Sequence, residues 1–157
     1  MPKKKVTSLS TEAKPGNESK LRYEDFLRSV KLYSLWMEEC ASKLDREKYW
    51  KYFPDDQGLT REISALYKTV EVEDDHFNVV AEYELTVKSS KEKKNLLEIK
   101  CTFSAHFHAS ADCNSVMADR FANSEAKIIL WPYFRSLVAD LVGKLQVPPI
   151  TIPLVLD

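Results

Sequence analysis

The segment CTFSAHFHASADC, residues 101–113, holds two cysteines and two histidines in a short stretch. Histidine and cysteine side chains are ligands that zinc prefers, and a thiolate beside an imidazole is a common catalytic nucleophile. His106 and His108 with Asp112 or Cys113 would suit a metal site, whereas Cys101 would suit covalent catalysis. Both kinds of chemistry require that the side chains meet, so the element that carries them decides the question.

Residues 95–110 alternate between apolar and polar side chains, which predicts a half-buried β-strand. Successive side chains of a strand point to opposite faces, so Cys101 faces the core while His106 and His108 face the other side. These three side chains cannot meet at one metal ion through the strand alone. A closed zinc site needs four ligands, and the only other histidine, His76, is predicted at a turn. We therefore predict no metal and no cofactor.

The remaining thiol and carboxyl groups offer no better catalytic arrangement. Cys40 follows Glu38 and Glu39, whose negative charges oppose formation of a thiolate. Glu82 and Glu84 lie on the polar face of another predicted strand, where a solvated charge is the ordinary role of a carboxylate. We predict that the chain is not an enzyme, and a small metal-dependent enzyme that uses the histidine pair remains the alternative from that class.

Composition and charge exclude several further classes of protein. The 157 residues are enough for one domain with a core, and the net charge of −1 gives no electrostatic drive toward nucleic acid or a membrane surface. Only three glycines are present and no glycine-rich phosphate-binding motif occurs. Three irregularly spaced cysteines, no apolar leader after the basic N-terminus and no apolar run near the roughly 20 residues needed to span a bilayer predict a cytoplasmic protein without membrane insertion.

Periodicity divides the chain into a polar tail and one domain. Residues 1–20 are basic and contain little that could be buried, so we predict a disordered tail followed by a domain at residues 21–157. Within the domain the pattern predicts a helical turn at 23–29, strands at 30–40, 61–73, 76–88 and 95–110, a polar connection at 41–60, helices at 115–122 and 123–146, and an extended proline-rich end at 147–157.

Three local features of these elements can be anticipated. The β-forming residues of 30–40 run without strict alternation, so both faces of this strand are expected to be covered. Ser115 is expected to cap the first C-terminal helix. Pro132 should kink the second C-terminal helix or restart it near Ile128, because proline removes a backbone donor.

The C-terminal part of the chain carries a family resemblance. Residues 130–135, LWPYFR, match a hydrophobic-[FWY]-Pro-Tyr-x-Arg element that lies within a helix in the protein-export chaperone SecB and its relatives. Residues 147–153, VPPITIP, match the proline-rich apolar extension that follows in that family. The whole segment 125–155 most resembles the SecB-like chaperones associated with toxin–antitoxin systems, and the order of the four predicted strands agrees with that family.

This resemblance implies an α+β fold with a four-stranded antiparallel sheet and C-terminal helices packed on one face, assembling as a dimer of dimers. It also implies an ATP-independent holdase that binds unfolded or precursor polypeptides in exposed apolar grooves, with SecA or a cognate antitoxin as a partner. The sequence ends at Asp157, without the further helix and SecA-contacting tail of SecB, and its outer sheet face has mixed charge. These departures favour a solitary or antitoxin-dedicated chaperone over the general export factor.

Two groups of residues are candidates for functional roles, one for contact with client polypeptides and one for packing of the fold or oligomer. Aromatic side chains are dense in the connection 41–60, and exposed aromatics provide large contact areas that suit many partner sequences. We assign client contact to Trp36, Met37, Tyr49, Trp50, Tyr52 and Phe53, and fold or oligomer packing to Trp131, Pro132, Tyr133, Leu137 and Leu141. The alternative for residues 49–53 is that they fold back and bury their rings. A second functional hypothesis is an adaptor dedicated to a single partner protein, without general holdase activity.

Overall fold

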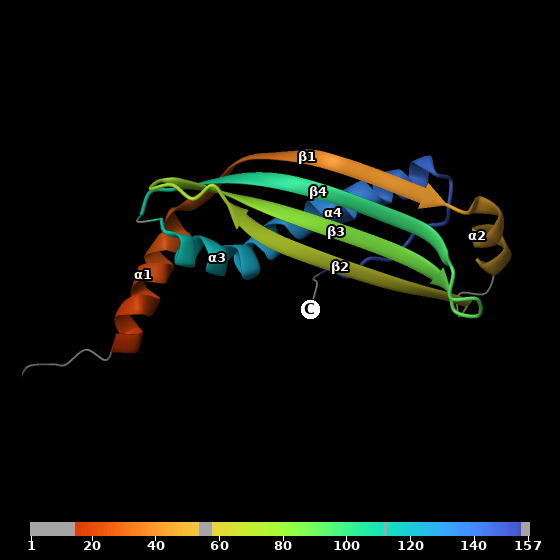
Figure 1. Ribbon diagram of the computed structural model, residues 1–157, viewed down its shortest axis with the longest axis horizontal. Helices are drawn as coiled ribbons and strands as arrows, with labels where there is room; N and C mark the ends of the chain where they lie inside the picture. The colour runs from red at the N-terminus through yellow and green to blue at the C-terminus, as the bar shows by residue number, and fades with distance from the viewer. Residues whose placement is uncertain (1–14, 54–57, 112, 155–157) are drawn as a thin grey trace, which may run out of the picture.

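A four-stranded sheet with a layer of helices forms the structure, a computed structural model that describes residues 15–53, 58–111 and 113–154 (Figure 1). In chain order the elements are α1 (Pro15–Ser29), β1 (Val30–Leu44), α2 (Arg46–Tyr52), β2 (Leu59–Val70), β3 (His76–Ser89), β4 (Asn95–Ala109), α3 (Ser115–Asn123) and α4 (Glu125–Lys144). The four predicted strands and the two predicted C-terminal helices are all present.

The sheet is antiparallel throughout, with the strand order β1-β4-β3-β2. Short turns join β2 to β3 and β3 to β4, whereas the long connection through α2 carries the chain from β1 at one edge of the sheet to β2 at the other. The predicted four-stranded antiparallel sheet is therefore confirmed. Within the described part of the chain, each edge strand has one backbone edge that no other strand pairs with.

The C-terminal helices cover one face of the sheet. In Figure 1, α4 runs behind the strands and α3 lies at the left-hand end of the sheet near α1, while α2 lies at the opposite end. Alternation along β3 and β4 sends apolar side chains toward this helix layer. The buried ones include Phe77, Val79, Ala81, Tyr83, Leu85, Val87, Leu97, Ile99, Cys101, Phe103, Ala105 and Phe107. The expected α+β arrangement with helices on one face is confirmed.

Aromatic rings hold the helices to the sheet. Phe134 of α4 is fully buried and stacks on Tyr83 of β3, with ring centroids 4.6 Å apart. Phe121 of α3 meets Phe77 and Phe107 edge-on, with centroid separations of 5.4 and 4.9 Å. Such pairs add roughly 0.5–1.5 kcal/mol each to the stabilisation that burial alone provides.

The N-terminal helix is longer than the helical turn predicted at 23–29. α1 begins at Pro15, so residues 15–20 are helical where we expected a disordered tail, and residues 1–14 lie outside the described residues. Phe26 anchors the helix, since it is fully buried with its ring centroid 5.9 Å from that of Phe77. Tyr23 donates a hydrogen bond of 2.6 Å to the Glu125 carboxylate at the start of α4. The boundary between tail and domain stays a prediction.

The connection 41–60 contains structure that the sequence pattern did not predict. β1 continues to Leu44 instead of ending at residue 40, and α2 follows it directly. Asp45 caps α2, because its carboxylate accepts a hydrogen bond of 3.2 Å from the backbone N–H of Lys48. With 7 residues, this helix is shorter than the window in which helical periodicity can be recognised.

α3 and α4 differ from the prediction in two details. Asn114, not Ser115, caps α3, because the Asn114 Oδ1 accepts a hydrogen bond of 3.0 Å from the backbone N–H of Met117. α4 runs as one helix from Glu125 to Lys144 with Pro132 inside it, so it does not restart near Ile128. Both Pro132 and Ile128 are exposed, which lets water hydrate the backbone carbonyl that the proline leaves without a donor.

The segment after α4 folds back over the helix layer. Val147 and Ile152 are buried, and the buried Trp131 donates a hydrogen bond of 2.9 Å from its Nε1 to the backbone carbonyl of Pro153. The predicted extended end is thus held to the domain through Trp131 of the LWPYFR element.

We expect Trp131→Phe to lower the free energy of unfolding by about 1–3 kcal/mol, because the change removes this hydrogen bond and leaves unfilled space beside Pro153. Urea denaturation followed by circular dichroism measures the loss. Tyr133→Phe, at an exposed neighbouring position, should stay within about 0.5 kcal/mol of the parent. An unchanged midpoint for Trp131→Phe would contradict the expected role of the indole.

Candidate functional site

Large apolar side chains remain exposed along β1 and beside it on α4. Trp36 and Met37 of β1 are 42% and 47% exposed, and Tyr33 is more exposed still. Tyr133 of α4 is 45% exposed and lines the same groove as these strand residues. Two elements from opposite ends of the sequence therefore form one apolar surface.

We call this surface the edge groove. It is an open hollow of about 490 Å³ lined by Leu32, Tyr33, Ser34, Leu35, Trp36, Met37, Phe103 and Tyr133. Apart from Ser34, the lining side chains are aliphatic or aromatic, and they include no carboxylate, imidazole or thiol. The groove can therefore receive apolar side chains, and its lining offers no acid–base pair for catalysis.

The irregular course of β1 leaves the groove open. The register between β1 and β4 shifts around Tyr33 and again around Glu38, which is typical of β-bulges in an edge strand. Next to the first shift, the Tyr33 ring lies 5.7 Å from the ring of His106. Next to the second, Trp36 donates a hydrogen bond from Nε1 to the Glu38 carboxylate. β1 is partly or fully exposed along its whole length, so the expectation that both its faces are covered is wrong.

The sequence did not predict all the residues of the edge groove. Strict alternation would place Leu32 and Leu35 on opposite faces of β1. The register shift around Tyr33 instead pairs Leu32 with Phe107 and Leu35 with Ala105, which are both core positions of β4. Only the strand pairing reveals that both leucines lie on the helix side of the sheet.

The aromatic side chains of α2 divide between the core and the surface. Tyr49 is only 2% exposed and belongs to the core, which is the alternative that we left open for residues 49–53. Trp50 is 45% exposed, and its ring meets that of the half-buried Phe53 edge-on at 5.8 Å. Tyr52 is half-buried and donates a hydrogen bond to the Glu92 carboxylate. None of these four lines the edge groove, so β1 and α2 carry separate aromatic surfaces.

The residues that we assigned to fold or oligomer packing occupy different environments. Trp131 is buried within the chain, whereas Pro132 and Tyr133 are exposed. Leu137 and Leu141 are half-buried and follow Tyr133 at the four-residue spacing of one helix face. This face of α4 continues the apolar character of the edge groove along the helix.

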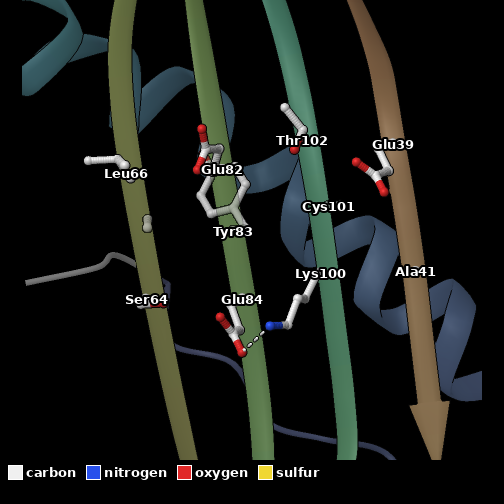
Figure 2. A pocket seen from close by; sticks show the side chains of 11 residues that line it. Glu39, Ala41, Ser64, Leu66, Glu82, Tyr83, Glu84, Lys100, Cys101 and Thr102 are labelled. Carbon is white, nitrogen blue, oxygen red and sulfur yellow. Dashed lines mark ion pairs between the residues drawn. The ribbon is translucent and has the colours of Figure 1, made fainter.

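The sheet face away from the helices is polar and hollowed at its centre (Figure 2). The polar side chains around this hollow are those of Glu39, Ser64, Glu82, Glu84, Lys100 and Thr102. Lys100 Nζ lies 3.0 Å from a Glu84 oxygen, and Lys68 Nζ lies 2.8 Å from a Glu82 oxygen. The hydrogen bond to Glu84 raises the pKa of Lys100. These carboxylates are therefore engaged in surface ion pairs, on a face of mixed charge as the sequence indicated.

The three histidines meet on this outer face, at the end of the sheet where β3 begins. His76 lies directly opposite His108 in the strand register and stacks on His106 with a centroid separation of 5.1 Å. Asp75 lies 2.7 Å from His76 Nδ1, and this hydrogen bond raises the pKa of His76 and lowers that of Asp75. Among the residues that the structure describes, no group of three possible ligands is arranged to hold a metal ion.

We expect His76→Gln to reduce stability more near about pH 5.5 than near about pH 8. Because the pKa of His76 is raised in the folded state, its protonation stabilises the fold. This contribution is fully present below the unfolded-state pKa of about 6.5, and it is lost as the pH rises through the folded-state pKa. The lowered pKa of Asp75 gives stability above its unfolded value of about 3.9. Urea denaturation midpoints of the variant and the parent, measured at both pH values, test this prediction. An equal loss of stability at the two pH values would contradict it.

Burial is the main cause that suppresses ionisation of the cysteines. It raises the pKa of Cys101 to about 12, with the neighbouring Cys40 as a smaller cause, and it also raises the pKa of Cys40. Burial likewise raises the pKa of Cys113. For Cys40 the cause is therefore burial and not the acidic neighbours that we expected. Thiols in such surroundings are poor nucleophiles at neutral pH.

Comparison with known proteins identifies the fold. No protein-family model matches the chain, and no curated protein sequence matches it. Among solved structures, the chain is similar to a Mycobacterium tuberculosis SecB-like chaperone in complex with a ChAD peptide from the HigA1 antitoxin, with a TM-score of 0.71, 17% identity, and coverage of 87% of this chain and 98% of that chain. A protein of unknown function from Streptococcus agalactiae is also similar, with a TM-score of 0.45, 10% identity, and coverage of 79% of this chain and 96% of that one.

The first of these similarities shows that the chain has the SecB-like fold, as the sequence resemblance implied. Across the described part of the chain, no helix combines the length and the apolar character that crossing a membrane requires.

Proposed function

We propose that this chain is a SecB-like molecular chaperone, a holdase that binds unfolded or precursor polypeptides without ATP. The observation that carries the proposal is the edge groove, an open apolar surface on a SecB-like fold. Contiguous exposed apolar surface marks a contact site in most proteins that carry it. The proposal needs no catalytic group and no cofactor.

The edge groove suits an extended polypeptide better than a compact ligand. It is open along β1, and Trp36, Met37 and Tyr133 offer aromatic rings and a flexible thioether that adapt to different side chains. Apolar side chains of an unfolded chain gain about 25 cal/mol for each Å² that they bury there. The backbone edge of β1 that no strand of the described chain covers supplies hydrogen-bonding groups that an extended segment can pair with.

A second contact surface on α2 supports the same function. Trp50 is exposed beside Phe53, with the half-buried Tyr52 on the same short helix. Since α2 begins just after the end of β1, a polypeptide that continues along β1 from the edge groove arrives at this helix. We assign client contact to these three residues together with Trp36 and Met37, and we leave out Tyr49, because its ring is buried.

An antitoxin segment is the specific partner that the comparisons support. The similar SecB-like chaperone is in complex with a peptide from an antitoxin, and a peptide of that kind can occupy an apolar groove as an unfolded client does. The outer sheet face carries ion pairs such as Lys100–Glu84, not the strongly acidic surface that the SecB resemblance associates with SecA contact. We therefore favour an antitoxin-associated role over hand-off to SecA.

We further propose that the chain assembles as a homotetramer in the cytoplasm. Tyr133, Leu137 and Leu141 form an exposed to half-buried apolar face of α4 that a second copy can cover. The net charge of −1 gives no reason to invoke nucleic acid as a partner.

Solution mass, measured alone and with a reduced, slow-folding client, tests the proposal. A tetramer that forms a stable complex with the unfolded client and not with its native form is the expected result. A monomer that ignores unfolded chains would overturn the holdase function. Saturable binding to one antitoxin-derived peptide, with none to generic unfolded clients, would replace the holdase by the dedicated adaptor.

A further inference from the structure

Cys40 and Cys101 lie directly opposite each other in the antiparallel pair formed by β1 and β4. Both belong to the side of the sheet that faces the helices, since their neighbours in register alternate with the polar positions Thr102 and Lys100. Directly opposed residues of antiparallel strands have Cα atoms about 4.5–5.5 Å apart. Disulfides span Cα separations of about 4.4–6.8 Å, so directly opposed positions such as these lie within the range that a disulfide bridges.

The two thiols differ in a way that gives an order of reaction. Cys40 is half-buried on an edge strand, whereas Cys101 is buried on a central strand. The register shift around Glu38 lies immediately before Cys40, and irregular edge strands open locally more easily than central ones. An attacking reagent therefore reaches Cys40 first, and Cys101 is placed to act as the resolving thiol.

We propose that Cys40 and Cys101 form a cross-strand disulfide by exchange with a low-molecular-weight disulfide such as oxidised glutathione. The Cys40 thiolate attacks one sulfur of glutathione disulfide, which forms a mixed disulfide and releases a glutathione thiolate. The Cys101 thiolate then attacks the Cys40 Sγ, which closes the protein disulfide and releases the second glutathione thiolate. The two cysteines lose two electrons and two protons, and these convert one glutathione disulfide into two glutathione thiols.

The disulfide would link the edge strand β1 covalently to β4, its only strand partner in the described chain. β1 carries Trp36 and Met37 just before the second register shift, so the bond would hold the strand that forms one wall of the edge groove. Because burial raises the pKa of both thiols, the reaction is slow at neutral pH and accelerates as the pH rises. The inference does not depend on the chaperone proposal, because its readout is a covalent bond.

The test uses the full chain carrying Cys113→Ser, so that the remaining thiol cannot scramble the product. This variant is treated with oxidised glutathione across a range of pH, and intact mass, free-thiol titration and peptide mapping follow the reaction. The matched control is Cys40→Ser in the same background. The parent chain, mapped in the same way, keeps the test valid if Cys113→Ser does not fold.

The expected product is a monomeric chain lighter by two hydrogen atoms, without free thiols, in which the peptides containing Cys40 and Cys101 are joined. The control should keep Cys101 free, and the rate should rise with pH. Three results would overturn the proposal: both thiols remain free, a glutathione adduct on Cys40 persists unresolved, or the bond forms between two chains.

Discussion

Replacing Phe134 with alanine should lower the free energy of unfolding by about 3–5 kcal/mol. The Phe134 ring is fully buried between α4 and the sheet, stacks on Tyr83 at 4.6 Å and lies 5.3 Å from the Trp131 ring. Removing it loses the transfer free energy of the ring and leaves a cavity between α4 and β3, where the Trp131 ring also contacts Tyr83 at 5.9 Å. The total free energy of unfolding of a small domain is about 5–15 kcal/mol, so the variant should be close to unfolding at moderate temperature.

Urea denaturation followed by tryptophan fluorescence and circular dichroism measures this loss. Ile128→Ala is the matched control, because Ile128 lies on the same helix but is exposed, and its change should stay within about 0.5 kcal/mol. A loss below about 1 kcal/mol for Phe134→Ala would mean that the helix layer is not held to the sheet through this contact.

Changing Trp36 and Met37 together to serine should weaken the suppression of client aggregation by about tenfold or more. Both residues are large exposed side chains that line the edge groove, and tryptophan is enriched among the contact residues that contribute 2 kcal/mol or more, about a 30-fold change in affinity. Because both side chains are already exposed, the change should have little effect on the stability of the chain itself. The measurement is the chaperone concentration that halves light scattering by an aggregating client.

The control variants separate the edge groove from other apolar surface. Val116→Ser removes an exposed apolar side chain of α3 outside the groove and should leave aggregation suppression unchanged. Trp50→Ser removes a tryptophan of similar exposure on α2, so it measures the contribution of the second surface. Solution mass is recorded for every variant, since a lost oligomer would also reduce binding. If the double variant keeps its mass and full activity, the edge groove is not the client site.

The sequence by itself determined the strands and helices with long, regular patterns. β3 and β4 alternate along most of their length, so the direction of Cys101 toward the core and of His106 and His108 away from it followed from local geometry. The apolar stripe of residues 123–146 likewise predicted α4, because one face of a helix can be recognised over several turns. The LWPYFR and VPPITIP segments pointed to the SecB-like fold, which the structural similarity confirms.

Short or irregular elements could not be predicted from sequence periodicity. α2 is too short for periodicity to show, so nothing in its sequence distinguished the buried Tyr49 from the exposed Trp50 beside it. The register shifts of β1 are not encoded in its alternation, and they decide which of its side chains line the edge groove.

Only the tertiary structure brought distant residues together. Tyr133 joins the β1 residues in the edge groove, His76 joins the two histidines of β4, and Cys40 meets Cys101, each across a long stretch of chain. The sequence pattern of one segment sets which side chains that segment presents to a face. Whether that face is then buried, left open or placed against another segment depends on strand order, register and helix packing, which are properties of contacts between segments and not of any one of them.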